Sequence, residues 1–199
     1  MRVCLIVNPV SGAHNGRPAL VRRQTDEAVS TLRDLGAEVE LRFTERRGHA
    51  TRIAAAAAAT GTDVVAAWGG DGTANEVGAA LAGSPSVLAV VPAGSGSGLA
   101  RALGVPLSWR GALGLVLRGD TRPIDVGTID GRAFVNVAGL GLDAHIARVF
   151  NDDRLARPGR RGLAAYVRVT LREFFRYEPL RCRVTVGGDL VEGTVLMVA

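Results

Sequence analysis

The sequence predicts an α/β fold in which a mostly parallel sheet carries helices on both faces, followed by part of an antiparallel β domain. Three observations support this prediction. Short apolar runs recur as buried strands, as at 3–7 and 87–91, and segments with helical spacing follow them. Glycine-rich loops stand where strands end, which is where open α/β sheets bind ligands. Beyond residue 122 the pattern shifts toward short strands, with Asp-Gly as a hairpin signal.

Length and composition favour one domain or two small ones. Of 199 residues, 47% are hydrophobic and 22% are charged, which is enough for a sizeable core. The shift in pattern places the domain boundary near Arg122, so we expect an α/β domain at 1–121 and a β-rich domain at 122–199. No apolar run approaches the roughly 18 residues of a membrane span. Together with the absence of a secretory signal and the two isolated cysteines, this predicts a cytoplasmic protein.

The basic residues are unusual because all 24 of them are arginine. Without lysine, the chain cannot form a Gly-x-x-x-x-Gly-Lys phosphate loop or use Schiff-base chemistry. Bound phosphate would have to be held by backbone amides, hydroxyl groups, arginine or a metal ion. The net charge of +5 suits an anionic membrane surface or nucleic acid, although an arginine-rich solvated surface explains it equally well.

The first part of the chain alternates between predicted strands and helices. The first strand is apolar on both faces, as in a buried strand of a parallel sheet, and the Asn8-Pro9 turn follows it. Gly36 ends the first helix. The elements expected here are a strand at 2–8, a helix at 18–35, a strand at 39–43 near an edge of the sheet, and an alanine-rich helix from Gly48-His49-Ala50 to Thr60.

The stretch with the most chemical information is Trp68-Gly69-Gly70-Asp71-Gly72-Thr73. It lies between a buried strand at 63–67 and a helix that we expect to begin near Thr73. Glycines at such a junction permit positive φ angles and allow a ligand to approach the bare backbone. The N–H groups of the turn and of the helix start then form a natural anion site.

Asp71 needs a separate explanation, because a carboxylate inside a phosphate site repels phosphate. It would hold a metal ion, bond to a hydroxyl group or accept a proton from one. The alternative is a tight turn in which Asp71 only caps the helix. The Gly-Gly-Asp-Gly motif alone does not decide between these roles.

A second glycine-rich loop, Pro92 to Gly98, follows the strand at 87–91 and carries the hydroxyl groups of Ser95 and Ser97. A short helix at 99–103 follows at once, which favours a binding loop over a flexible linker. The later elements expected are a helix at 109–118 capped by Ser108, a hairpin of strands at 124–129 and 133–137, helices at 141–150 and 163–177 around a polar, basic loop at 151–162, and a hairpin of strands at 180–186 and 190–198.

Four ordered stretches resemble the catalytic domain of the diacylglycerol kinase family, which includes bacterial lipid kinases and the sphingosine and ceramide kinases. They are Asn8-Pro9-Val10-Ser11-Gly12; Thr44 with Gly48-His49-Ala50; Gly69-Gly70-Asp71-Gly72-Thr73 with Asn75-Glu76-Val77; and Pro92-Ala93-Gly94-Ser95-Gly96-Ser97-Gly98-Leu99-Ala100-Arg101. The likeness continues through Asp125-Val126-Gly127 and from Asn136 to Asp143, so it covers nearly the whole chain. It implies a nucleotide domain like those of NAD kinase and diacylglycerol kinase.

The resemblance also implies a function, that of an ATP-dependent lipid kinase in phospholipid biosynthesis. Such an enzyme transfers the terminal phosphate of ATP to the hydroxyl group of diacylglycerol or a sphingosine-like lipid, with Mg²⁺ as cofactor. Asp71 is the expected catalytic residue, as a proton-accepting base, and the metal ligands are left open. The expected ATP contacts are Asn8, Pro9, Ser11, Gly12, Thr44, Gly69, Gly70, Asp71, Gly72, Thr73, Asn75, Glu76 and Ser95.

The partners implied are ATP and a lipid, reached by peripheral contact with the inner face of a membrane. No nucleic acid is expected, and a homodimer is left open. The predicted helix at 163–177 carries three arginines at helical spacing together with aromatic residues. This pattern suits a membrane surface, or simply a solvated face.

The chain also departs from the family pattern. Ser97 stands where many relatives have asparagine, which weakens one hydrogen-bonding contact. Family members continue beyond the position of Ala199 through segments that supply magnesium-linked acidic residues. We therefore expect the 199-residue chain to be C-terminally truncated and inactive by itself. Two alternatives stay open: a non-catalytic or truncated nucleotide-binding module, and a small-molecule kinase of the NAD kinase type, against which the Pro92–Gly98 loop argues.

Overall fold

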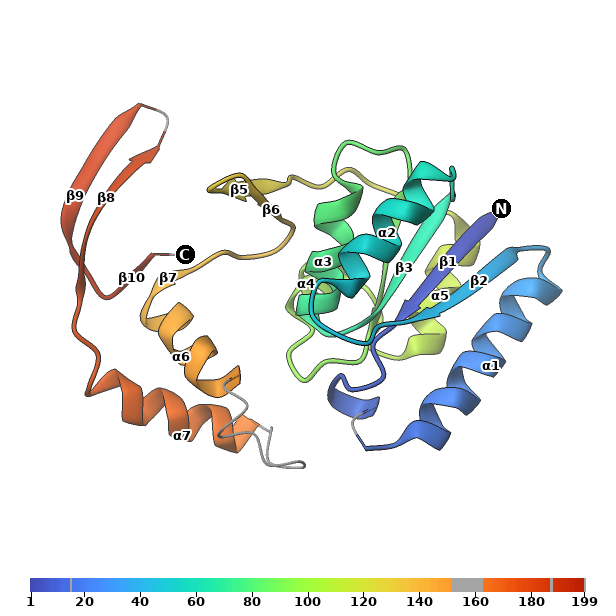
Figure 1. Cartoon of the computed structure of the whole chain (residues 1–199), viewed down its shortest axis with the longest axis horizontal. Helices are drawn as coiled ribbons and strands as arrows, with labels where there is room; N and C mark the ends of the chain where they lie inside the picture. The colour runs from blue at the N-terminus through green and yellow to red at the C-terminus, as the bar shows by residue number, and fades with distance from the viewer. Residues whose placement is uncertain (15, 152–162, 187, 199) are drawn as a thin grey trace. The chain divides into compact units, whose positions relative to one another are not determined.

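The computed structural model describes residues 1–14, 16–151, 163–186 and 188–198, and it divides into two compact units (Figure 1). Unit 1 is Met1–Asn136 and unit 2 is Val137–Ala199. The division between the units falls after Asn136, because Val135 remains part of unit 1. Its side chain is buried and its N–H donates to Asn75 Oδ1 at 3.1 Å. The domain boundary near Arg122 stays a prediction.

Unit 1 is built on a parallel four-stranded sheet with the strand order β2-β1-β3-β4, which confirms the predicted fold class (Figure 1). The strands are β1 (Arg2–Val7), β2 (Glu38–Phe43), β3 (Val64–Gly69) and β4 (Val87–Pro92). β2 lies at an edge, as predicted, and the central β3 is buried along its whole length. Because the strands run in one direction, the loops that follow them gather at one end of the sheet.

Helices cross between the strands, since neighbouring parallel strands require a long connection. They are α1 (Pro18–Asp34), α2 (His49–Ala59), α3 (Asp71–Leu81), α4 (Gly98–Ala102) and α5 (Trp109–Arg118), with a 3₁₀ turn η1 (Gly12–His14) after β1. α1 and α5 cover one face of the sheet, and α2, α3 and α4 cover the other. α3 begins at Asp71, slightly earlier than predicted, because Gly70 takes the N-cap position.

The two hydrophobic cores of unit 1 lie on opposite faces of the sheet. Side chains of β1 alternate between them: residues 3, 5 and 7 face α1 and α5, whereas residues 4 and 6 face α2 and α3. α2 meets its face with alanines at helical spacing, so this helix lies close against the sheet. Those alanines are Ala50, Ala54 and Ala57.

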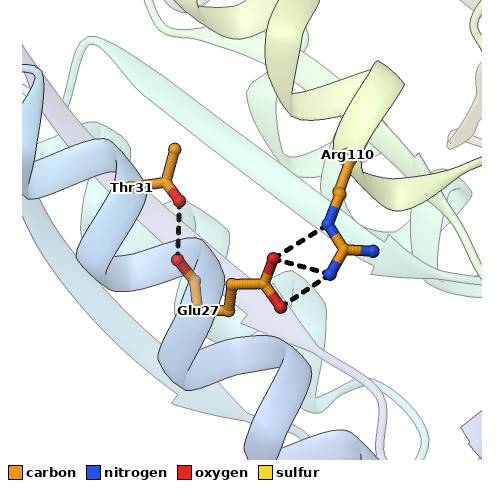
Figure 2. Close-up of polar contacts among 3 residues, drawn as sticks. All are labelled: Glu27, Thr31 and Arg110. Atoms are coloured by element: carbon orange, nitrogen blue, oxygen red, sulfur yellow. Dashed lines mark hydrogen bonds and ion pairs between the residues drawn. The ribbon is translucent and has the colours of Figure 1, made fainter.

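An ion pair and an aromatic stack hold α5 against α1 and the end of β3. Figure 2 shows Arg110 donating to both carboxylate oxygens of Glu27, with distances between 2.6 and 2.8 Å. The guanidinium also lies over the Trp109 ring, 4.3 Å from its centroid, and Trp109 stacks on the buried Trp68 at 5.4 Å. The ion pair is exposed and contributes about 0–1 kcal/mol. The stack fixes the residue that directly precedes the glycine-rich turn.

The hairpin predicted around Asp130-Gly131 is confirmed, with shorter strands than expected. β5 (Gly127–Ile129) and β6 (Arg132–Phe134) pair antiparallel. Asp130 and Gly131 have φ angles of 49° and 71°, the left-handed pair that a two-residue type I′ turn requires.

Unit 2 combines two helices with short antiparallel strands. Its elements are β7 (Leu140–Gly141), α6 (Leu142–Asn151), α7 (Leu163–Phe174), β8 (Leu180–Val186), β9 (Asp189–Val195) and β10 (Met197–Val198). β8 and β9 form the predicted hairpin, and β10 pairs with β7. The strand predicted at 190–198 is interrupted at Leu196. After Asn151, the loop predicted at 151–162 lies outside the described residues.

A charged cluster connects α6 to α7. His145 Nε2 lies 2.8 Å from Glu173 Oε2, and Arg172 Nε donates to Glu173 Oε1 at 2.7 Å. These two hydrogen bonds, from His145 first and Arg172 second, lower the pKa of the Glu173 carboxyl below its ordinary value. In the part of the chain that the structure describes, no helix is long and apolar enough to cross a membrane.

Candidate functional site

The loops after β1, β2, β3 and β4 meet at the carboxyl end of the sheet and are joined to it by backbone hydrogen bonds. The Asn8 N–H donates to the Trp68 carbonyl at 2.9 Å, and the Thr44 N–H donates to the Val7 carbonyl at 2.9 Å. On the other side of β3, the Ala93 N–H donates to the Gly69 carbonyl at 2.8 Å. The four sequence stretches therefore belong to one surface.

Close packing between these loops explains three of the glycines. A Cβ added at Gly94 would lie 2.7 Å from Gly70 Cα, and one added at Gly12 would lie 2.1 Å from the Ala93 carbonyl oxygen. A Cβ at Gly69 would lie 2.4 Å from Thr73 Oγ1. Atoms do not approach this closely without a shift of the surrounding structure. The glycines at 12, 69 and 94 are thus required by contacts within the protein itself.

Gly72 is different, because a Cβ added there meets no atom within 4 Å beyond its chain neighbours and the backbone of its own helix. It is the second residue of α3, where glycine is a poor helix former. None of Gly69, Gly70 and Gly72 has a positive φ angle, so the conformational freedom expected of these three residues is not used. Packing does not require a glycine at position 72, and its effect is to keep the space in front of the first turn of α3 open.

The first turn of α3 contains backbone N–H groups that lack a partner in the part of the chain that the structure describes. The N–H groups of Thr73 and Ala74 both donate to the Gly70 carbonyl, at 3.0 and 3.1 Å. Among the described residues, the N–H groups of Asp71 and Gly72 have no protein acceptor, as expected at the start of a helix. Two free donors and the positive end of the helix dipole form a site suited to an anion.

Thr73 and Asp71 connect α3 to the loops after β1 and β4. Thr73 is buried, and its Oγ1 accepts a hydrogen bond from Asn8 Nδ2 at 3.2 Å. Asp71 Oδ1 accepts the Leu99 N–H at 3.0 Å, so Asp71 caps α4 and not its own helix. Asp71 is half-buried, and within the described part of the chain its Oδ2 accepts no hydrogen bond.

Asn75 and Glu76 point toward other segments of unit 1. Asn75 Oδ1 accepts the Val135 N–H at 3.1 Å, which holds the segment after β6. Glu76 uses both carboxylate oxygens: Oε1 accepts the Gly48 N–H at 2.9 Å and Oε2 accepts the Ala50 N–H at 3.2 Å. The nucleotide contacts predicted through these two residues stay predictions, and their protein contacts provide a second role for each.

The loop after β1 is supported by a residue that the sequence analysis missed. His14 is 2% exposed, its Nδ1 lies 3.2 Å from the Asn8 carbonyl oxygen, and its ring packs on Trp68. Ser11 Oγ donates to the same carbonyl at 3.1 Å. Periodicity could not have indicated His14, because it lies in a single 3₁₀ turn, too short to show a pattern, and its side chain gains its partners only from the fold.

The serines of the loop after β4 divide between two roles. Ser97 is buried, has a φ angle of 49° and donates through Oγ to the Gly94 carbonyl at 3.1 Å, so it shapes the loop. Ser95 is exposed and available to a ligand. The predicted contacts thus lie in the loops after the four strands and on the first two turns of α3. They are Asn8, Pro9, Ser11 and Gly12 after β1; Thr44 after β2; Gly69 at the end of β3 and Gly70 directly after it; Asp71, Gly72, Thr73, Asn75 and Glu76 on α3; and Ser95 after β4.

Comparison with known proteins identifies relatives of this chain. A protein of Pseudomonas aeruginosa (strain UCBPP-PA14) named "Probable lipid kinase YegS-like" is 40% identical over 129 residues, which are 63% of this chain and 42% of that protein. A diacylglycerol kinase of Staphylococcus aureus (strain JH9) is 36% identical over 142 residues, which are 70% of this chain and 44% of that protein. The matched region covers less than half the length of either relative.

Comparison with solved structures concerns the fold. The crystal structure of a diacylglycerol kinase from Bacillus anthracis str. Sterne superposes with a TM-score of 0.71 at 24% identity, covering 98% of this chain and 62% of that one. This likeness establishes the fold. Residues 2–129 match the family model of the diacylglycerol kinase catalytic domain, well over half of the 199 residues. The chain therefore belongs to the diacylglycerol kinase catalytic-domain family.

Proposed function

We propose that this protein is an ATP-dependent lipid kinase in which unit 1 binds the nucleotide. The observation that carries the proposal is the start of α3. Among the described residues the N–H groups of Asp71 and Gly72 have no protein acceptor, and a Cβ added at Gly72 meets no atom within 4 Å beyond its chain neighbours and the backbone of its own helix. Such a helix start attracts phosphate. Family membership supports a kinase, and the names of the two relatives support a lipid as the acceptor.

Phosphoryl transfer depends mainly on positioning and on neutralising charge in the transition state. In our proposal the Asp71 and Gly72 amides hold a phosphate group of ATP at the start of α3. The loops that carry Asn8, Thr44 and Ser95 lie around it and orient the rest of the nucleotide. Since the chain contains no lysine, arginine and a metal ion remain as sources of positive charge.

The residues present fit Mg²⁺ as the metal. Magnesium is commonly bound by one or two carboxylates together with substrate phosphates and water, and Asp71 supplies one carboxylate beside the proposed phosphate site. Among the described residues, no three His, Cys, Asp or Glu side chains come together as a metal cluster. Bound magnesium would offset phosphate charge.

Asp71 is the proposed catalytic residue. Its Oδ1 is held by the Leu99 N–H, which fixes the orientation of the carboxylate, while Oδ2 is free of protein donors in the described residues. A fixed carboxylate with one free oxygen is suited to accept the proton of an attacking hydroxyl group. Holding the metal is the other role open to this oxygen.

We further propose that the lipid is reached by peripheral contact with the inner face of a membrane. α7 and the residue after it carry exposed apolar side chains, with Leu171 58% and Phe175 83% exposed. The exposed arginines Arg168 and Arg176 lie on the same segment. Exposed apolar groups beside arginines are typical of helices that bind membrane surfaces. A homodimer stays a prediction.

The test has two steps. ATP binding to the 199-residue chain is measured by calorimetry, with and without Mg²⁺. Transfer of labelled phosphate from ATP to diacylglycerol, sphingosine or NAD is then assayed with this chain and with any longer product that its reading frame encodes. We expect the 199-residue chain to bind ATP, and we expect label in a lipid with the longer product. Label in NAD alone would identify a small-molecule kinase. ATP binding with no phosphate transfer by either protein would identify a non-catalytic module. A chain that binds no ATP would overturn the proposal.

A further inference from the structure

Glu76 lies on the second turn of α3 and caps a different helix. Its two carboxylate oxygens accept the N–H groups of Gly48 and Ala50, at 2.9 and 3.2 Å, where α2 begins. Gly48 is the N-cap residue of α2, with a φ angle of 77°, and has no side chain with which to cap the helix. Two N–H groups at this helix start are thus satisfied from α3.

The segment that Glu76 holds is the loop between β2 and α2, residues 44–48. The near end of the loop is fixed to the sheet through the Thr44 N–H, and its interior closes on itself. The Glu45 N–H donates to His49 Nδ1 at 3.2 Å, and the His49 N–H donates to the Arg46 carbonyl at 3.2 Å. The two hydrogen bonds to the Glu76 carboxylate join the far end of the loop and the first residues of α2 to α3.

We propose that Glu76 is a positioning residue for the nucleotide, which holds the 44–48 loop in place relative to the phosphate donors of α3. This inference rests on the proposed function. Both carboxylate oxygens already accept a backbone N–H, and bonds between a carboxylate and an amide are strong. The phosphate donors and Glu76 belong to one short helix, so the loop and the donors keep a fixed spacing. Glu76 acts on ATP through the loop and does not touch it.

Two substitutions separate the contributions of the carboxylate. Glu76→Ala removes both acceptors. Glu76→Gln keeps one acceptor oxygen but turns an NH₂ group toward a backbone N–H, so it loses one bond and keeps the size of the side chain. Each lost bond should weaken ATP binding by roughly three- to tenfold. The expected order of affinity is wild type, then Glu76→Gln, then Glu76→Ala.

A matched control is Glu38→Gln, which makes the same chemical change on an exposed side chain at the start of β2, the end of the strand opposite to the loop. The first measurement is hydrogen exchange at the Gly48 and Ala50 amides in the ligand-free protein. We expect faster exchange at both amides in Glu76→Ala, a smaller increase in Glu76→Gln and no change in Glu38→Gln. The second measurement is ATP affinity for the same four proteins.

The combined results decide the role. Faster exchange with unchanged ATP affinity would make Glu76 only a helix cap and overturn the proposal. Weaker ATP binding with unchanged exchange would make Glu76 a direct contact, which also overturns it. If Glu76→Ala does not fold, Glu76→Gln provides the same comparison. If the wild-type protein binds no ATP, both the proposed function and the role of Glu76 in positioning the nucleotide are refuted. The hydrogen-exchange data would still show whether Glu76 holds the 44–48 loop in place.

Discussion

Replacing Gly72 with alanine should separate the stability of α3 from its ability to bind phosphate. Gly72 has no positive φ angle and lies inside the helix, and an added Cβ would meet no atom within 4 Å beyond its chain neighbours and the backbone of the helix. Alanine is more favourable than glycine in a helix by about 0.5–1 kcal/mol. We therefore expect the free energy of unfolding to rise by up to about that amount, and Tm to rise by about 2–4 °C.

ATP affinity should change in the opposite direction. The Cβ of a helical residue tilts toward the helix N-terminus, so the new methyl group enters the space beside the Asp71 and Gly72 amides. A phosphate kept away from one of these amides loses a hydrogen bond to a charged group, which costs about 1.5–3 kcal/mol. This corresponds to a loss of affinity of roughly 10- to 100-fold, and Gly72→Val should lose more.

The assay combines thermal unfolding, followed by circular dichroism, with calorimetric titration of ATP. Gly69→Ala is the control for steric conflict, because its Cβ would lie 2.4 Å from Thr73 Oγ1. That variant should be destabilised by about 1–3 kcal/mol. A Gly72→Ala protein that is stable and binds ATP as tightly as wild type would refute the placement of phosphate at the start of α3. A Gly72→Ala protein that is less stable than wild type would refute the conclusion that the fold has room for a side chain at position 72.

Three further predictions concern single ionisable groups. Asp71→Asn should lower turnover by about 100-fold or more and leave ATP affinity without Mg²⁺ unchanged or higher, and retained turnover would reduce Asp71 to a cap of α4. Burial, and secondly the Glu40 carboxylate, raise the pKa of the Cys4 thiol to about 11, so about one thiol in a thousand is ionised at pH 8. Iodoacetamide should then label the native protein at Cys182, and rapid labelling of Cys4 would contradict its packing. Because the folded pKa of Glu173 is lowered, its stabilising effect is present above the ordinary value of 4.5 and is lost as the pH falls through the folded value. In urea unfolding, the free energy of unfolding of the Glu173→Gln variant should fall less steeply at acid pH than that of the wild type. An equally steep fall would show that the Glu173 carboxyl does not cause the loss of stability in acid.

The sequence was sufficient for the strands and helices of unit 1 because each has a local signal. Apolar runs predicted β1 and β4, Gly36 marked the end of α1, and Asp130-Gly131 marked the hairpin. The unit boundary has no local signal. The pattern changes near Arg122, but a later residue, Val135, still packs on Gly78, where an added Cβ would lie 2.8 Å from its side chain. Contacts of this range cannot be found from periodicity.

The roles of individual site residues were harder to predict than their location. The sequence placed Asn75 and Glu76 among the nucleotide contacts, and the fold places both on the same helix as the proposed phosphate site. Their side-chain oxygens, however, accept N–H groups of the protein at Val135, Gly48 and Ala50. A carboxylate or an amide in a motif suits a ligand and a neighbouring loop equally well. Only the geometry distinguishes these two possibilities.

The start of α3 therefore combines a binding site with the structure that supports it. Among the described residues, its backbone offers two donors without an acceptor, while the side chains of Asp71, Thr73 and Glu76 each connect to the loop of a different strand. One short helix thus determines where all of these loops lie relative to a bound phosphate. It follows that loss of ATP affinity in a variant of this motif does not by itself identify a ligand contact. Thr73→Val should illustrate this: it removes the acceptor for Asn8 Nδ2 but no free donor, so it should disturb the loop after β1 before ATP is added.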